Sequence, residues 1–483
     1  MGRLRRLADA TPPSRNRYVD LLRALAIILV VLGHWTVTAI GHDAAGQPTG
    51  RSALPDLSWA YPLTWAFQVM PVFFLVGGYA NAASLTAHRS RGGDATGWLL
   101  GRSARLLRPT TVLIIVLATA ALVARVLGAD PSLIRTVVWS ATIPVWFLAA
   151  YLAVVPLTPL MYGLHRRYGL RVPVVLAFLV AVGDLGRLLG SDASALSNYL
   201  FGWLAVHQLG FAWYDVHAEG LRPPGAGGRA APTPDAPPAP RGDPGGPPPS
   251  VRSAGLRSPR LPLSRRAGWT AMLGGTAVTV LLTGPGPYPV TMINVPGEPL
   301  NNAAPPSLAL LAVATAQVGL IVLLRGPAGR WLRRDRPWMA VIAVNSVVLT
   351  VFLWHLSATI LLIGALDAVG LLPTPAAGSA AWLAWRIPWV LMLTVILAAL
   401  VAVFGPVEAR TGRPPAAESA GGAPWRPALT VAGFTAVVFA LVDNAVVAPT
   451  DAEPLGLPVP ALVAYLAGAG ILRLLRSGWG SRG

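Results

Sequence analysis

The sequence predicts an all-α membrane protein, a polytopic bundle of about twelve transmembrane helices. Of its 483 residues, 54% are hydrophobic and only 12% are charged, and the mean hydropathy is +0.57. Apolar runs of roughly 20 residues, the length that a bilayer core requires, recur along the chain. Arginine residues concentrate in every second segment between these runs. Together these observations exclude an ordinary soluble domain.

Twelve apolar runs are long enough to be transmembrane helices. Their approximate ranges are 18–40, 62–86, 106–128, 136–162, 171–189, 196–216, 267–283, 306–324, 338–365, 382–405, 428–448 and 457–475.

Arginine supplies all the basic charge, because the chain has 38 basic residues and no lysine. It gathers after the even-numbered runs, and eight arginines lie between Arg222 and Arg266 alone. Cytoplasmic loops are enriched in this way, so we predict a multi-pass cell-membrane protein with both termini in the cytoplasm. The net charge of +18 therefore indicates orientation in the membrane, and nucleic acid is not an expected partner. The excess of Arg, Ala, Gly and Pro suggests a GC-rich, bacterial gene.

Three polar segments separate the apolar runs most clearly. Residues 1–16 are short and rich in arginine, which indicates a cytoplasmic tail. Residues 218–264 are rich in proline and glycine and lack the apolar side chains that offset ordering entropy, so we expect a disordered cytoplasmic linker. The segment 284–305 contains no arginine. It either connects two helices on the outer side or covers an external site.

Cysteine is absent, which excludes disulfides, thiolate metal sites and acyl-cysteine chemistry. No His, Asp and Glu residues have the spacing of a metal site, so neither a metal nor a bound cofactor is expected. The chain also lacks the G-x-S-x-G element of serine hydrolases.

The stretch RYVDLLRALAIILVVLGHW, from Arg17 to Trp35, begins the first apolar run and contains three ionisable side chains. These are Asp20, Arg23 and His34, and ionisable groups inside a membrane span are costly, which makes them candidates for function. At ~100° per residue, Arg23 and His34 lie on one helix face, about 16 Å apart along the axis. Asp20 is three residues before Arg23 and can pair with it. The alternative is an arginine anchor at the membrane edge and a packed histidine.

The second and third runs carry two further motifs. In MPVFFLVGGY, Pro71 should kink or break the helix, and the backbone groups that it frees must be satisfied inside the bundle. Gly77 and Gly78 permit close approach of another helix. In GRSARLLRP, Arg102 and Arg105 belong to a ridge of guanidinium groups suited to phosphates, unless these arginines only set the topology.

These motifs, in this order, resemble the acyltransferase-3 family of integral membrane acyltransferases. Arg102 and Arg105 match an Arg-x-x-Arg element, His355 in VFLWHLSAT matches Tyr-x-x-His, and Glu408 in AVFGPVEAR matches a closing Val-Glu element. MPVFFLVGGY is similar to Met-Pro-x-Phe-Phe-x-x-Ser-Gly-Tyr. Two departures are Gly77 in place of the usual Ser and Phe352 in place of the usual Tyr. The resemblance implies a ten-helix domain at 17–412, which leaves two further helices and a tail at 413–483.

The resemblance implies a transfer reaction and roles for these residues. The donor would be acyl-CoA, a co-substrate, and the acceptor a hydroxyl or amine of a carbohydrate, lipid or other molecule. His34 would act as general base or briefly carry the acyl group, and Arg23, paired with Asp20, would orient the donor or stabilise negative charge. Arg102 and Arg105 would bind the donor, while His355 and Glu408 are further candidates. Contacts with membrane lipids are expected throughout.

A twelve-helix transporter or lipid flippase is the competing hypothesis. The central linker divides the chain into two sets of six runs, as in many transporters. The seventh run, however, does not repeat the motif of the first, and internal repeats are expected of such transporters. Other polar residues in the runs are more consistent with structural roles; these are Asp184, Arg187, His207, Asp215 and Asn345.

Overall fold

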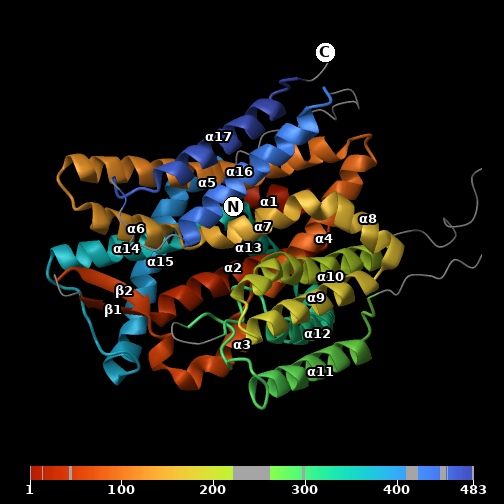
Figure 1. Ribbon diagram of the computed structural model, residues 1–483, viewed down its shortest axis with the longest axis horizontal. Helices are drawn as coiled ribbons and strands as arrows, with labels where there is room; N and C mark the ends of the chain where they lie inside the picture. Colours follow the sequence, from red (N-terminus) through yellow and green to blue (C-terminus); the bar gives the residue numbers. More distant parts are fainter. Residues whose placement is uncertain are drawn as a thin grey trace, which may run out of the picture.

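The computed structural model describes residues 2–12, 15–42, 46–220, 261–295, 300–409, 423–446, 453 and 455–480, and these form a bundle of helices with one small hairpin (Figure 1). The helices are α1 (Gly2–Asp9), α2 (Arg17–Val37), α3 (Thr64–Phe67), α4 (Met70–Arg89), α5 (Ala95–Val126), α6 (Pro131–Thr142), α7 (Val145–Val154), α8 (Thr158–Tyr168), α9 (Arg171–Leu188), α10 (Asn198–Gly220), α11 (Arg265–Thr283), α12 (Leu308–Trp331), α13 (Asp335–Ser346), α14 (Val348–Ala368), α15 (Ala380–Ala409), α16 (Arg426–Val446) and α17 (Val459–Arg476). The strands are β1 (Thr38–His42) and β2 (Pro48–Ser52).

The helical, membrane-spanning character predicted from the sequence is confirmed, but the count of twelve spans is not. Each of the twelve apolar runs coincides with a helix, and nine helical stretches of the described chain are long and apolar enough to cross a membrane. The three apolar runs that do not meet this criterion correspond to α9, α10 and α11. Polar groups lower the apolar character of two of them, since Asp184 lies in α9, and Asp215 in α10.

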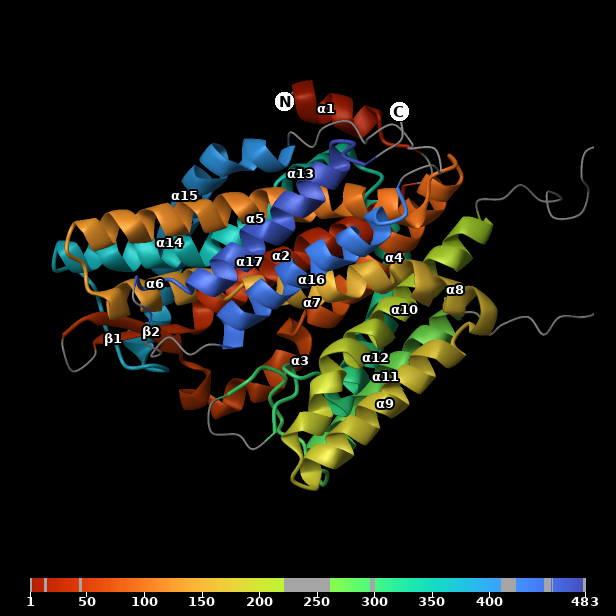
Figure 2. The same ribbon diagram turned by 45° about the horizontal axis from the view of Figure 1, so that its top comes forward.

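The helices form two groups that run in different directions. Figure 2 shows α9, α10, α11 and α12 side by side, next to a larger group that includes α2, α5, α7 and α14. Helix α10 joins the groups because it packs closely along α4. A Cβ atom on Gly78 would lie 2.1 Å from the carbonyl oxygen of His207, and one on Gly210 would lie 2.1 Å from that of Leu75. The predicted close approach at Gly78 therefore occurs, with α10 as the partner.

Helix α4 begins late because the chain bends immediately before Pro71. Residues 58–67 form a 3₁₀ turn and the short helix α3, and Pro71 lies in the first turn of α4, where its missing N–H costs nothing. The backbone carbonyls of Trp65 and Gln68 each accept a hydrogen bond of 2.9 Å from the side-chain amide of Gln317 in α12. The backbone groups that the break frees are thus satisfied inside the bundle, as the sequence predicts.

Two further runs are each divided between helices. The run 136–162 covers α6, α7 and the start of α8, and it breaks at Ile143 and Pro144, so α6 is separate and the spanning stretch is Val145–Tyr168. Pro144 has no N–H group to continue the hydrogen bonds of α6, which explains this break. The run 338–365 breaks at Val347, between α13 and α14. No proline or glycine marks the second break, so hydropathy alone does not predict it.

Further departures occur near the ends of α2 and α10. The loop after α2 forms an antiparallel hairpin in which Ile40 pairs with Gly50, so the described chain is not purely helical. Residues 2–9 of the predicted tail form α1, which packs on α13. Helix α10 continues to Gly220, inside the predicted linker 218–264, most of which (221–260) lies outside the described residues. The predicted boundary at 412 also lies outside them.

The two C-terminal helices attach to the outside of the larger group. Helices α16 and α17 pack tightly on each other, where a Cβ atom on Gly468 would lie 2.7 Å from the carbonyl oxygen of Gly433. Helix α17 packs on α5, and α16 packs on α7. The hydroxyls of Tyr465 and Thr111 are 3.0 Å apart, so the contact with α5 includes a polar bond.

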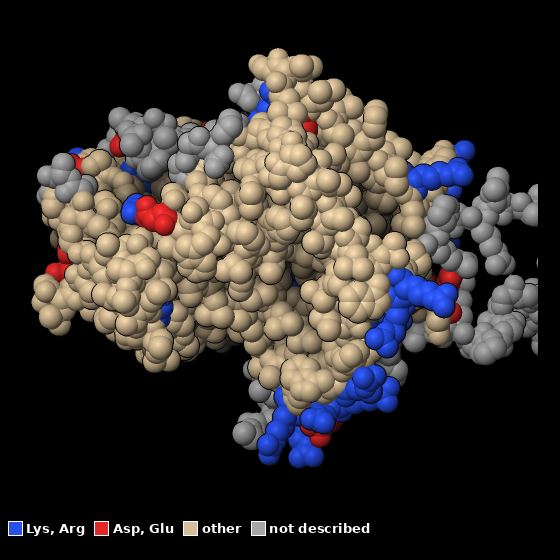
Figure 3. Space-filling model, turned by 90° about the horizontal axis from the view of Figure 1, so that it is seen from below, with Lys and Arg blue, Asp and Glu red and all other residues tan. Residues whose placement is uncertain are grey.

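Basic side chains gather along part of the face shown in Figure 3, where most of those in view lie toward the right and lower edges. Exposed arginines lie at the start of α11, at the end of α12, in the turn before α13 and in the first turn of α13; they are Arg265, Arg266, Arg325, Arg330, Arg333, Arg334 and Arg336.

Candidate active site

Asp20 and Arg23 form the predicted ion pair near the start of α2. The Nη2 group of Arg23 donates to the Asp20 carboxylate over 2.9 Å, and Arg15 donates two hydrogen bonds to the same carboxylate. Asn345 of α13 holds both members, since its oxygen accepts from Nε of Arg23 at 2.5 Å and its amide donates to the backbone carbonyl of Asp20. Two arginines therefore occupy both oxygens of the Asp20 carboxylate. In this arrangement Asp20 orients the guanidinium group of Arg23.

His34 lies on the same face of α2 as Arg23, as the spacing predicts. The exposed apolar residues of this helix, Leu25, Ile28 and Leu32, lie roughly 140–200° away from Arg23 and mark the lipid-facing side. The side chain of His34 is nevertheless exposed, which is the condition for contact with a substrate.

His34 is paired with the second predicted histidine, His355 of α14. Nδ1 of His34 and Nε2 of His355 are 3.0 Å apart, and Nδ1 of His355 is 2.6 Å from the carbonyl oxygen of Phe352. A carbonyl oxygen only accepts, so Nδ1 of His355 carries a proton, and with neutral rings its Nε2 accepts from Nδ1–H of His34. This chain of bonds leaves Nε2 of His34 with a free lone pair.

Helices α14 and α15 fix the end of α2 that carries His34. The indole of Trp35 donates to the carbonyl of His355 at 3.1 Å, and the indole of Trp389 donates to the carbonyl of Trp35 at 3.1 Å. Arg386 donates to the carbonyl of Thr38 at 2.7 Å. Trp389 and Arg386 thus satisfy carbonyl groups at the C-terminal end of α2, which have no partner within the helix, and the positive charge of Arg386 suits that end. The histidine pair is thereby held in place from three helices.

Arg102 lies in a buried polar cluster contributed by four helices. Its Nη2 group donates to the side-chain oxygen of Asn81 in α4 and to the hydroxyl of Tyr151 in α7, the latter at 3.4 Å. The amide nitrogen of Asn81 is 3.1 Å from Nε2 of His207 in α10. Asn81 and His207 are both fully buried. Asn81, Tyr151 and His207 are uncharged, so they do not neutralise the positive charge of Arg102.

Arg23 and the two predicted donor-binding arginines converge on one region. Arg102 is close enough to repel both Arg23 and Arg105, and Tyr151 lies near the same two arginines. Arg105 is exposed. Asp20 pairs with Arg23, but in the described part of the chain no ion pair with a carboxylate joins Arg102 or Arg105. A cluster of this kind is prepared for an anion, and guanidinium groups bind phosphate well.

Aromatic rings connect this arginine cluster with the histidine pair. The ring centroids of Tyr151 and Phe147 are 6.3 Å apart, those of Phe147 and Phe352 are 5.4 Å apart, and those of Phe352 and His355 are 6.0 Å apart. Arg23 of the arginine cluster and His34 of the histidine pair are about 16 Å apart along α2. The row of rings between the two regions suits a ligand with an anionic end and a less polar remainder.

Glu408 lies outside the histidine pair and caps the helix that carries His355. Its carboxylate accepts from the backbone N–H groups of Leu349 and Thr350 at 3.0 and 2.7 Å, and from the Thr350 hydroxyl at 2.7 Å. The first N–H groups of a helix lack internal partners, and a carboxylate there is favoured by the helix dipole. Glu408 therefore accounts for the start of α14 after the break at Val347.

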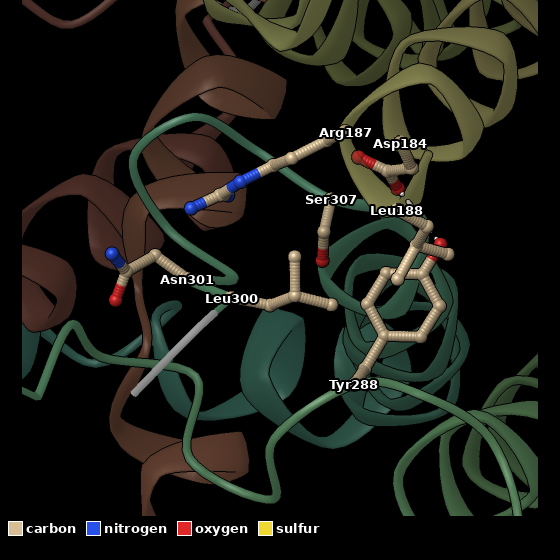
Figure 4. A pocket seen from close by; sticks show the side chains of 7 residues that line it. All are labelled: Asp184, Arg187, Leu188, Tyr288, Leu300, Asn301 and Ser307. Carbon is tan, nitrogen blue, oxygen red and sulfur yellow. Dashed lines mark hydrogen bonds between the residues drawn. The ribbon is translucent and has the colours of Figure 1, made fainter. Parts of the chain in front are cut away.

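A very small pocket lies away from these residues, where α9 meets Tyr288, Leu300, Asn301 and Ser307. Figure 4 shows Arg187 and Asn301 on one side of it and Asp184 and Tyr288 on the other. The carboxylate of Asp184 accepts from Asn198, from the Tyr288 hydroxyl and from the backbone of Leu308. These bonds tie the outer segment to the bundle, which supports the structural role expected for Asp184. None of the candidate catalytic residues lines this pocket.

The sequence did not single out several residues of the site. Asn81 and Tyr151 lie in apolar runs where they resemble ordinary core residues, and His207 and Asn345 were assigned structural roles. A lone Asn in a membrane span is itself a signal, because an unpaired amide there is costly. Arg386 carries the same signal in α15. Among the described residues, no group of three or more His, Asp or Glu side chains is placed to hold a metal ion.

The fold and the site define the chain as a multi-pass membrane protein whose interior holds a histidine pair and a cluster of arginines. The sequence model of the acyltransferase domain of the acyltransferase-3 family matches residues 16–407, more than three quarters of the chain. The protein therefore belongs to the acyltransferase-3 family, as the motifs predict. No curated protein and no solved structure matches the chain.

Proposed function

We propose that this protein transfers an acyl group from acyl-CoA to a hydroxyl or amine of a carbohydrate or lipid, with His34 as general base. The observation that carries this proposal is the chain of hydrogen bonds from Phe352 through His355 to His34. It leaves a lone pair on Nε2 of His34, whose side chain is exposed. Membership in an acyltransferase family supports the reaction class.

The histidine pair suits both halves of the transfer. Nε2 of His34 takes the proton of the acceptor group as its oxygen or nitrogen attacks the thioester carbonyl. The imidazolium that forms donates from Nδ1 to His355, a hydrogen bond that strengthens with the charge. Collapse of the tetrahedral intermediate expels the CoA thiolate, which takes the proton back from Nε2. The same lone pair suits the alternative in which His34 briefly carries the acyl group.

The arginine cluster suits the CoA part of the donor. CoA is anionic, and Arg102 and Arg105 have guanidinium groups without carboxylate partners in the described chain. From there an extended pantetheine arm, passing along the row of rings, can cover the ~16 Å to His34. Arg23, held by Asp20 and Asn345, lies at the same end and would orient the donor as it enters.

A binding experiment tests the donor site. Purified protein is titrated with labelled acyl-CoA, and Arg102→Lys/Arg105→Lys should bind more weakly because lysine keeps the charge but lacks the bidentate fork. Alanine at both positions should weaken binding further. Arg89→Ala/Arg91→Ala is the matched control. Both arginines are exposed near the C-terminal end of α4 and lie outside the arginine cluster. Wild-type affinity in the double alanine variant would show that Arg102 and Arg105 only set the topology.

We also propose that the arginine cluster and both termini face the cytoplasm, where acyl-CoA is available. The alternation of arginine in the sequence supports this orientation. Protease added to right-side-out vesicles should leave the segment 218–264 intact, and cleavage there from outside would reverse the topology.

The transporter hypothesis is not favoured, because the family match is to an acyltransferase domain. Reconstituted vesicles distinguish the two functions directly. An acyltransferase consumes acyl-CoA in proportion to acylated acceptor, whereas a transporter accumulates solute and leaves acyl-CoA unchanged.

A further inference from the structure

Tyr151 lies where three positively charged side chains meet. Its hydroxyl accepts from Nη2 of Arg102 at 3.4 Å and donates to the side-chain oxygen of Asn81 at 3.4 Å. The same oxygen of Asn81 accepts directly from Arg102. Tyr151 also lies near Arg23 and Arg105. The phenol and the amide thus form a closed triangle with the guanidinium group of Arg102.

The orientation of the Asn81 amide is fixed from the opposite side. Its nitrogen can only donate, so Nε2 of His207 accepts the bond between them, and the proton of that ring lies on Nδ1. This places the amide oxygen toward Arg102 and Tyr151. Because Asn81 and His207 are fully buried on tightly packed helices, neither is free to turn away.

Glycine at position 77 makes room for Tyr151. A Cβ atom on Gly77 would lie 2.7 Å from Cε2 of Tyr151 and 3.3 Å from its hydroxyl oxygen. Real Cβ atoms do not approach a ring carbon that closely, so any larger residue at 77 displaces the tyrosine ring. At position 77 this chain has glycine, whereas the related motif has serine. The hydroxyl of Tyr151 lies within reach of the space that a serine at 77 would occupy.

We propose that Tyr151 and Asn81 are positioning residues for Arg102, and that Tyr151 supplies at this site the hydroxyl that Gly77 lacks. Both partners are neutral, so they orient the guanidinium group without cancelling the charge that the donor phosphates require. This inference rests on the donor site proposed above. It adds that the affinity for acyl-CoA depends on uncharged groups around Arg102, and that residues 77 and 151 act as a pair.

Three single variants test the positioning role through the Kd for labelled acyl-CoA and through kcat. Tyr151→Phe removes one hydroxyl and should raise the Kd roughly 3- to 10-fold, the effect of one neutral hydrogen bond, with little change in kcat. Asn81→Asp keeps the shape and the acceptor but neutralises Arg102, so the Kd should rise more than in Tyr151→Phe. Tyr162→Phe is the matched control, because this tyrosine donates to Asp215 outside the cluster. Its Kd should equal that of wild type.

A double-mutant cycle tests the pairing of residues 77 and 151. Gly77→Ser alone should weaken donor binding, since its Cβ meets the tyrosine ring. Tyr151→Ala should weaken it as well, because the hydroxyl is lost. In Gly77→Ser/Tyr151→Ala the serine has room and returns a hydroxyl, so this double variant should bind acyl-CoA more tightly than either single variant. Additive losses in the double variant would overturn the pairing.

The outcomes separate this inference from the donor site itself. If Arg102→Ala binds acyl-CoA like wild type, the proposed donor site is wrong. If Arg102→Ala binds weakly while Tyr151→Phe and Asn81→Asp bind like wild type, only the positioning role is overturned. Membrane insertion and a monodisperse elution profile are checked for every variant, and Tyr151→Phe, which removes a single atom, remains informative if the others fail to fold.

Discussion

Replacement of His355 by phenylalanine should lower kcat and leave the affinity for acyl-CoA unchanged. The variant keeps a ring in the fully buried position but removes the acceptor that lies 3.0 Å from Nδ1 of His34. In the resting enzyme this bond joins two neutral rings. When His34 takes the proton of the acceptor group, the donor becomes an imidazolium, and the bond becomes charge-assisted.

The size of the effect follows from this change in charge. Hydrogen bonds to charged groups contribute about 1.5–3 kcal/mol and neutral ones about 1 kcal/mol, so this bond gains about 0.5–2 kcal/mol when His34 is protonated. Since about 1.36 kcal/mol corresponds to tenfold in rate, kcat should fall roughly 2- to 30-fold. The arginine cluster is about 16 Å away along α2, so the KM for acyl-CoA should not change. His355→Gln, whose amide oxygen can accept from Nδ1–H, should recover part of the loss.

The assay is acyl transfer from labelled acyl-CoA by purified protein in proteoliposomes. His165→Phe serves as the control, because His165 is also buried but lies in α8 beside Asp215, outside the histidine pair. Its kcat should stay near that of wild type. A wild-type kcat in His355→Phe would refute the argument that His355 fixes the tautomer and stabilises the charge of His34.

Two other substitutions test the supports of the site. Glu408→Gln weakens the cap of α14 by about 1 kcal/mol, which should appear as a lower Tm in detergent and a modest loss of kcat; an unchanged Tm would argue against the cap. Arg386→Leu removes the bond to the carbonyl of Thr38 at the end of α2, worth about 0.5–1.5 kcal/mol. It should lower kcat and leave the Kd for acyl-CoA unchanged. A change in Kd alone would contradict the role of Arg386 in fixing the end of α2 that carries His34.

Hydropathy predicts the positions of the helices well because membrane insertion depends on short, continuous sequence. Hydropathy does not predict a helix boundary that depends on a residue far away in the sequence. The run 338–365 is apolar across Val347, yet α13 ends there, and Glu408 begins α14 by capping it from about sixty positions further along the chain. The hairpin after α2 is missed for a different reason, since its strands are short and partly exposed.

In the candidate site, too, some features follow from the sequence alone and others require the folded chain. Arg23 and His34 share one helix, so their spacing alone predicts the common face that the structure has. The pairing of His34 with His355 joins residues more than 300 positions apart and requires the folded bundle. Asn81 and Tyr151 were overlooked because an isolated polar residue in an apolar run has no periodic signature, and only their convergence on Arg102 gives them a role.

The most direct test of the account is acyl transfer by His34→Ala. Wild type and variant are reconstituted at equal amounts, and both the binding of labelled acyl-CoA and the formation of acylated acceptor are measured. The account predicts that His34→Ala inserts normally and binds acyl-CoA with wild-type affinity but forms no product, because the base is lost while the arginine cluster is intact. Product formation by His34→Ala at the wild-type rate would contradict the central role of this histidine.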